Sequence, residues 1–166
     1  NGSTPSFGAM YWQYYEDLDK ISQQKTGLAV DKKLFKENVS DKGVSLTELT
    51  STDKLKIGDK VVVRLTVRAD RDFDFVHLKD MRAACFEPTQ MTSGRNWRGE
   101  LSYYQETKDA STNFFIDYLS KGTYVLEYSV YVNRSGSYSN GISTIQCLYA
   151  PEFTSHTGGV RIEVAK

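Results

Sequence analysis

The sequence has few of the residues that usually build catalytic or metal sites. It contains only two cysteines, two histidines and three prolines. Two widely separated cysteines do not make a disulfide framework, and no cysteine or histidine pair has the spacing of zinc ligands. Phosphate-binding loops and serine-triad motifs are also absent. These absences argue against disulfide scaffolds, zinc modules and phosphate-binding enzymes, and no cofactor is expected.

The sequence also lacks an excess of either charge and a long hydrophobic run. Its 21 basic and 21 acidic side chains cancel, so no global field attracts nucleic acid or an anionic membrane. No apolar stretch approaches the ~20 residues of a membrane span, and no signal peptide is expected in these residues. The opening NGSTPSF is interpreted as a linker or a cut inside a longer chain. Neither nucleic-acid binding nor direct membrane insertion is expected.

Hydrophobic and aromatic residues are plentiful. They make up 39% and 13% of the sequence, with 11 Tyr and 8 Phe. This composition is too apolar for a disordered chain. A single domain of 166 residues can bury roughly 70% of the surface of its unfolded chain.

The dominant period of the hydrophobic pattern is two. In 60–69, Val61, Val63, Leu65 and Val67 fall on one face. Residues 122–133 alternate in the same way, and 72–78 place Phe73, Phe75 and His77 opposite Asp72, Asp74 and Val76. Further strands are predicted at 27–36, 44–50, 100–106, 112–117, 142–149 and 159–165. Closely spaced strands separated by turn residues predict an all-β, antiparallel two-sheet β-sandwich of immunoglobulin-like type.

Residues 8–21 do not fit this pattern clearly. Tyr11, Tyr14, Tyr15, Leu18 and Ile21 have helical spacing, but aromatic residues favour strands. Periodicity alone leaves helix and strand open for this segment.

Cys147 is the first candidate for chemistry. A cysteine nucleophile needs a base within hydrogen-bond reach, and the two histidines are predicted in a strand (His77) and in a loop (His156). In the strand 142–149, Cys147 shares a face with Ile145 and Tyr149, as a buried small hydrophobe does. We therefore expect Cys147 to pack in the core or to pair with Cys85 in a disulfide.

Two other groups of residues have a functional and a structural interpretation. Asp70, Asp72, Asp74 and Asp80 could suggest calcium, but no glycine-containing calcium loop accompanies them, which favours a solvated strand face. Trp97 lies between a glycine turn and a strand. It could stack on a sugar or a partner surface, although packing is the common role of such rings.

From about residue 27 onward, the order of motifs resembles the C-terminal macroglobulin-like domain of bacterial alpha-2-macroglobulins. The motifs are KIGDKVVVRLTV, DMRAACFE, SYYQETKDASTNFFIDYLSKGTYVLEYSVYV and GSYSNGISTIQCLYAPEF. In DMRAACFE, Asp80, Ala84 and Glu87 match the family, whereas Ala83 and Cys85 replace its Pro and Gly. GAMYWQYYEDLDKI is similar to the stretch that follows the preceding domain, which favours an extended strand for 8–21. The resemblance divides the chain into a linker or trailing strand (1–26) and a macroglobulin-like domain (27–166).

The resemblance implies a non-enzymatic role in a protease-trapping inhibitor. In the family, the last domain packs against a separate domain that carries a reactive thioester, and a Met-Tyr dipeptide shields the thioester from water. Leu148 and Tyr149 stand at the matching positions, with Pro151 expected to end their strand. The implied partners are the other domains of a parent chain, and target proteases through the parent. The implied location is the periplasm or the cell surface.

Two alternatives stay open at this point. One is a carbohydrate-binding or adhesion β-sandwich that uses Trp97 and neighbouring tyrosines as a stacking platform. The other is a structural spacer domain without a site of its own.

Overall fold

The computed structural model describes residues 8–41 and 43–165. The strands in this part of the chain are β1 (Leu28–Ser40), β2 (Gly43–Glu48), β3 (Lys54–Lys56), β4 (Lys60–Ala69), β5 (Phe73–Met81), β6 (Phe86–Pro88), β7 (Gly94–Arg98), β8 (Leu101–Thr107), β9 (Ser111–Leu119), β10 (Gly122–Val132), β11 (Gly136–Asn140), β12 (Ser143–Cys147), β13 (Ala150–His156) and β14 (Val160–Ala165). No helix in these ranges is long and apolar enough to cross a membrane.

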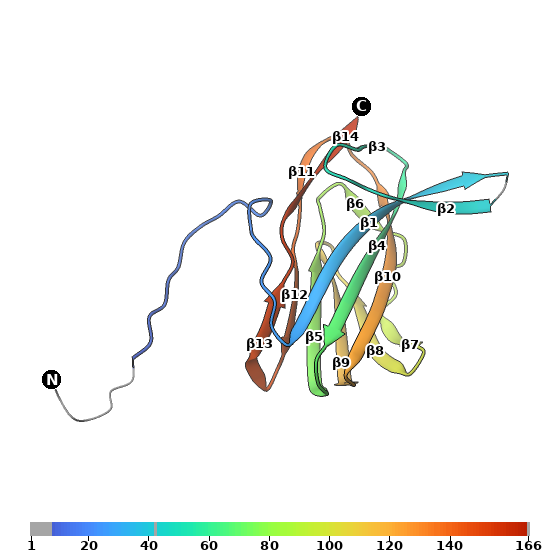
Figure 1. Ribbon diagram of the computed structural model, residues 1–166. Helices are drawn as coiled ribbons and strands as arrows, with labels where there is room; N and C mark the ends of the chain where they lie inside the picture. Colours follow the sequence, from blue (N-terminus) through green and yellow to red (C-terminus); the bar gives the residue numbers. More distant parts are fainter. Residues whose placement is uncertain (1–7, 42, 166) are drawn as a thin grey trace, which may run out of the picture.

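The strands form two large sheets and one small one (Figure 1). The five-stranded sheet has the order β2-β1-β4-β10-β6, and the six-stranded sheet has the order β13-β12-β5-β9-β8-β7. The small sheet β11-β14-β3 contains a parallel pair, β14 with β3. The prediction of an all-β sandwich is confirmed. The small sheet and its parallel pair are additions to the expected two antiparallel sheets.

Alternating residues of the strands build the core between the two large sheets. On β4, Val61, Val63, Leu65 and Val67 are all buried, as their spacing predicts. They belong to one cluster with residues from the six-stranded sheet, such as Phe114. Each inward-facing strand position removes an apolar side chain from water, and this burial is the main stabilising contribution to such a fold.

All nine predicted strands are present, but five others were not predicted. The strand expected at 142–149 ends earlier, at Cys147. The strands that were missed are β3, β6, β7, β11 and β13. Two of them have only 3 residues, and β13 contains Pro151, a residue that usually argues against a strand.

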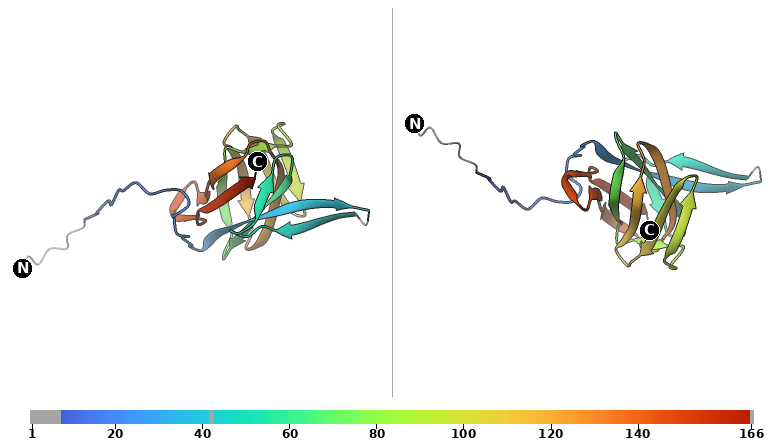
Figure 2. Two further views of the ribbon diagram at one scale, coloured as in Figure 1. Left: turned by 90° about the horizontal axis from the view of Figure 1, so that it is seen from above. Right: turned by 90° about the horizontal axis from the view of Figure 1, so that it is seen from below.

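Two segments project from the sandwich in opposite directions (Figures 1 and 2). One is a hairpin arm, formed by the distal half of β1 and by β2, on which every residue of β2 is exposed. The other is the N-terminal segment, of which residues 1–7 lie outside the described residues. Residues 8–17 are neither helix nor paired strand, and residues 18–20 form a turn. The strand expected for 8–21 would belong to a preceding domain, so it stays a prediction.

The N-terminal segment joins the domain just before β1. Gln24 and His156 exchange backbone hydrogen bonds, and the N–H of Gly159 donates to the carbonyl oxygen of Ile21 at 2.9 Å. A Cβ atom at position 159 would lie 1.7 Å from the carbonyl oxygen of Leu18. Only glycine lets the two backbones approach this closely.

Candidate functional site

Leu148 and Tyr149 form the two-residue turn that connects β12 to β13. Their exposed fractions are 48% and 79%. The sequence had suggested that they close a strand ended by Pro151. In the structure the strand ends at Cys147, and Pro151 is instead the second residue of β13. The apolar pair therefore stands at the tip of a hairpin.

A bulge in β13 explains how proline fits there. Cys147 pairs with Ala150, but Gln146 pairs with Thr154, so residues 151–153 are extra residues on the edge strand. Proline has no N–H to donate and is tolerated on edge strands and at bulges.

The bulge also turns Phe153 toward the domain, where its ring meets that of Phe73 edge-on, with the ring centroids 5.1 Å apart. This contact fixes the base of the hairpin.

Phe75 on β5 supports the turn from the neighbouring strand. Its carbonyl oxygen accepts the N–H of Leu148 at 2.9 Å. Its ring packs edge-to-face against Tyr149, with the centroids 5.2 Å apart at 83°, a favourable aromatic geometry. Phe75 itself is 47% exposed. We call Phe75, Leu148 and Tyr149 the tip cluster.

Phe75 has an unusual backbone conformation. Its φ is +53°, in the left-handed region that costs a bulky residue about 1–2 kcal/mol. The alternation shifts by one residue there, so that Phe73 and Val76 are both buried while Phe75 faces solvent. The predicted alternation of 72–78 is therefore wrong at Phe73. The support role of Phe75 was not predicted from the sequence, although the apolar Phe-Val pair at 75–76 breaks strict alternation and was a signal.

Cys147 occupies the core face that the sequence predicted. It lies on the same side of β12 as Ile145 and is buried, and its Sγ contacts the carbonyl oxygen of Asp74 at 3.2 Å. His156 lies in β13 rather than in a loop, and it pairs with Thr144, three residues from Cys147 on the opposite face of the sheet. This arrangement gives the thiol no imidazole base.

The structure does not contain the disulfide considered for Cys85 and Cys147. Both are free and buried. Cys147 pairs with Val76 near the start of β5, whereas Cys85 follows the end of that strand at Met81. Val76 and Met81 are about 17 Å apart at the rise of a β-strand, well beyond the Cα separation of a disulfide. Burial raises the pKa of the Cys85 thiol to about 11, which keeps it protonated and unreactive.

Asp80 is fully buried, so the interpretation of the acidic run as a solvated face is wrong at this residue. Its carboxylate accepts hydrogen bonds from Lys32 at 2.7 Å, Tyr128 at 2.5 Å and Ser143 at 2.7 Å. Lys32 and Tyr128 lie on the five-stranded sheet, and Asp80 and Ser143 on the other. This buried network joins the two sheets. No cluster of three or more potential metal ligands occurs among the residues that the structure describes.

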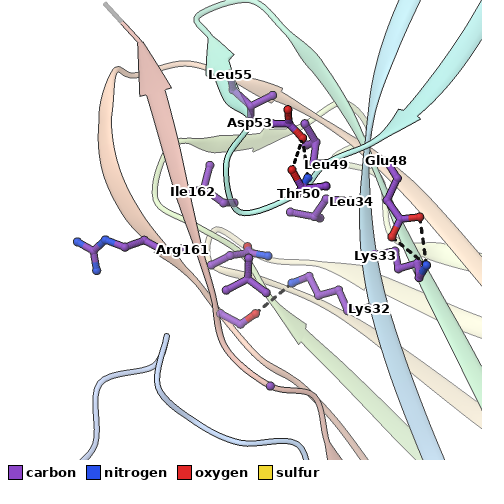
Figure 3. A pocket seen from close by; sticks show the side chains of 14 residues that line it. Lys32, Lys33, Leu34, Glu48, Leu49, Thr50, Asp53, Leu55, Arg161 and Ile162 are labelled. Carbon is purple, nitrogen blue, oxygen red and sulfur yellow. Dashed lines mark hydrogen bonds and ion pairs between the residues drawn. The ribbon is translucent and has the colours of Figure 1, made fainter.

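A cavity of about 110 Å³ lies between β1 and β14 (Figure 3). Its apolar lining includes Leu34, Leu49, Leu55 and Ile162. Charged groups at its mouth pair with one another or with neighbours: Lys33 with Glu48 at 2.8 Å, Arg161 with Asp19 at 3.3 Å, and Asp53 with Thr50 at 2.7 Å. Charged groups that are already paired in this way are typical of a structural surface rather than of a catalytic site.

Together, the two large sheets and the exposed hairpin tip define a β-sandwich domain with an apolar turn at one end. Residues 27–152 match the family model described as the bacterial alpha-2-macroglobulin MG10 domain, and the chain belongs to that family.

Solved alpha-2-macroglobulins have the same fold. The chain is similar to Salmonella alpha-2-macroglobulin reacted with methylamine, with 16% identity and a TM-score of 0.68 over 89% of this chain and 10% of that one. It is also similar to native Escherichia coli alpha-2-macroglobulin from domain MG7 to the C-terminus, with 16% identity and a TM-score of 0.70 over 87% and 24% of the two chains.

A curated relative comes from a different kind of protein. It is the circularly permutated Ras protein 2 of Dictyostelium discoideum, 24% identical over 159 residues, which are 93% of this chain and 4% of that protein. The chain thus spans only a small part of each of these three proteins.

Proposed function

We propose that this domain is a non-catalytic module of an alpha-2-macroglobulin-like protease-trapping protein, and that its tip cluster packs against a thioester-bearing domain of the same parent chain. The observation that carries the proposal is the exposed position of Leu148 and Tyr149 on a turn held by Phe75 and by the β13 bulge. An apolar pair on such a support can dock without much loss of conformational entropy.

The chemistry of a thioester gives the tip cluster its proposed role. A thioester is lost when water reaches its carbonyl carbon, so side chains that exclude water extend its lifetime. Tyr149 supplies a broad ring with a polar end, and Leu148 supplies a branched apolar group. Leucine in place of the family's methionine keeps the volume and loses some adaptability. We further propose a periplasmic or cell-surface location for the parent protein.

The test uses the full-length parent, after release of a thiol by methylamine has shown that it contains a thioester. Leu148→Ala together with Tyr149→Ala is expected to speed the spontaneous loss of methylamine reactivity by about tenfold, equal to about 1.4 kcal/mol of barrier. Val39→Ala with Val44→Ala is the matched control, because these valines are another exposed, paired apolar couple, on the hairpin arm. An unchanged rate in the tip variant would falsify the shielding role.

A further inference from the structure

The solvent faces of the two large sheets differ in chemistry. On the five-stranded sheet, charged side chains form ion pairs across neighbouring strands. These pairs are Lys33 with Glu48 at 2.8 Å, Arg64 with Glu127 at 2.5 Å, Lys60 with Glu37 at 2.9 Å, and Arg68 with Asp31. A face covered by cross-strand ion pairs is suited to contact with water.

The six-stranded sheet instead carries aromatic side chains in register on its outer face. His77 on β5 is opposite Phe115 on β9, and their rings stack with the centroids 4.7 Å apart. Phe115 is in turn opposite Tyr104 on β8. Trp97 on β7 is opposite Ser102, two residues from Tyr104, and is 68% exposed. Trp97 therefore lies within a strand, not between a turn and a strand as the sequence suggested.

This aromatic row continues into the tip cluster. Phe75 and His77 are outward-facing on β5, and Phe75 contacts Tyr149 at the hairpin tip. From β5 to β7 the row crosses three strand spacings, or about 14 Å. We call the set Tyr149, Phe75, Phe115, Tyr104 and Trp97 the aromatic face. Contiguous exposed apolar patches on a folded domain mark interaction sites.

We propose that the aromatic face is a domain–domain interface, covered by the same neighbouring domain of the parent chain that the tip cluster contacts. This inference rests on the proposed function, which it extends from the turn to the whole outer face of the six-stranded sheet. It also orients the domain, because the ion-paired face of the five-stranded sheet then remains in water.

Three observations favour a protein domain as the occupant. The chain spans 10% and 24% of two of the solved chains that it resembles, so those proteins provide many neighbouring domains. Trp and Tyr are the residues that most often anchor protein interfaces. Both arginines of β7 are paired, Arg95 with Asp117 at 3.2 Å and Arg98 with Glu127 at 3.1 Å. The surroundings of Trp97 are therefore balanced in charge, which does not favour an anionic polymer or lipid surface.

Engineered cysteines can map the covered face, since both cysteines of this chain are buried and add little to the background labelling. Lys79 is exposed on the outer face of β5, and Thr123 is exposed on the outer face of β10 in the other sheet. In the full-length parent, a maleimide should label Lys79→Cys about tenfold more slowly than in the isolated chain, equal to about 1.4 kcal/mol of docking free energy. Labelling of Thr123→Cys, the control, should be the same in both.

A third probe separates this inference from the proposed function. Lys79 is four residues along β5 from Phe75, or about 13 Å from the tip cluster. If Tyr149→Cys is protected in the parent while Lys79→Cys is labelled freely, only the tip docks and the extended interface is wrong. If both are labelled freely, the proposed docking of the tip is wrong as well. Protection of Thr123→Cys instead of Lys79→Cys would reverse the proposed orientation and so refute it.

A second measurement adds Trp97→Ala to the full-length parent that carries Lys79→Cys, and follows the rate of maleimide labelling. Loss of this anchor should speed the labelling of Lys79→Cys, whereas Tyr131→Ala, which removes an exposed ring from the five-stranded face, should not. The competing occupant is a neutral glycan. Binding of the isolated chain to neutral oligosaccharides on a glycan array, lost in Trp97→Ala, together with free labelling of Lys79→Cys in the parent, would overturn the inference in favour of a carbohydrate-binding face.

Discussion

At the scale of single residues, Phe75 differs most from its neighbours. It is the only non-glycine residue with positive φ in the described ranges, and it lies on an otherwise regular strand beside the turn that we assign to docking. A strained residue kept at such a place is often part of a functional site. Here the strain has a visible result, because it turns Phe75 outward to support Tyr149.

This strain predicts an unusual order of stability among substitutions at position 75. Glycine accepts a φ of +53° without steric cost, whereas alanine keeps the penalty of its Cβ atom. Phe75→Gly should therefore be more stable than Phe75→Ala by about 1 kcal/mol in the free energy of unfolding, measured by urea denaturation.

The same pair of substitutions at His77 is the control. His77 lies two residues further along β5, also on the outer face, and its backbone is not in the left-handed region. There Ala should be more stable than Gly by about 0.5–1 kcal/mol, the usual order inside a strand. The same order at both positions would show that the conformation of Phe75 is not strained.

At the scale of strands, the network around Asp80 joins the two sheets. Lys32 and Asp80 have side-chain exposures of 7% and 0%. Each charge is balanced by the other, Tyr128 and Ser143 also donate to Asp80, and Lys32 also donates to the carbonyl oxygens of Met81 and Gly141. Removing one member leaves a buried charge without its partner. That loss is more damaging than the loss of an apolar contact of similar size.

Asp80→Ala is expected to lower the free energy of unfolding by about 3–5 kcal/mol. Adding Lys32→Met should restore part of this loss, because the unpaired ammonium is then removed. Chemical denaturation of both single variants and the double variant gives the coupling energy. In contrast, Lys33→Ala, which breaks an exposed pair with Glu48, should cost less than about 1 kcal/mol. Full additivity of the two buried substitutions would contradict the network.

The sequence predicted the strands of the sandwich better than it predicted the site. Long strands such as β4 and β10 show alternation over many residues, whereas β3 and β6 are too short to show a period. Asp80 has the parity of the exposed Asp72 and Asp74 but also that of the buried Val76 and Leu78, so alternation does not decide its side. Nothing local indicates that Lys32, 48 positions away, neutralises it. Leu148 and Tyr149 were identified by family resemblance. Their turn was not predicted, because Pro151 suggested the end of a strand, whereas it lies in a bulge of the next strand.

At the scale of the whole molecule, a buried tyrosine hydroxyl and a buried cysteine thiol make the free energy of unfolding sensitive to high pH. Desolvation, strengthened by the negative charge of Asp80, raises the pKa of Tyr128 well above its usual value of 10.0. Burial also raises the pKa of Cys85 from 9.0 to about 11. Above pH 9 the unfolded chain releases protons that the folded chain keeps, so folding then binds protons and weakens as pH rises.

The contribution of these two groups to stability should therefore be constant below pH 9. Above pH 9 the stability should fall, first as the unfolded chain loses the proton of Cys85 and then as it loses that of Tyr128. Urea midpoints measured from neutral pH upward test this. Cys85→Ala should remove the part of the decline that begins near pH 9, and Tyr128→Phe the part that begins near pH 10. Tyr131→Phe, which lies outside the buried network, is the control. A decline unaffected by both core substitutions would contradict this assignment.

The hairpin arm has a consequence for the handling of this domain. Within 8–41 and 43–165, its outer strand β2 pairs only with β1, and Val44 and Leu46 are exposed on it. An open edge of this kind can add a strand from another molecule. At high concentration the arm is therefore the place where self-association into fibrils should begin, and a proline in β2 would be the simplest way to keep the domain monodisperse.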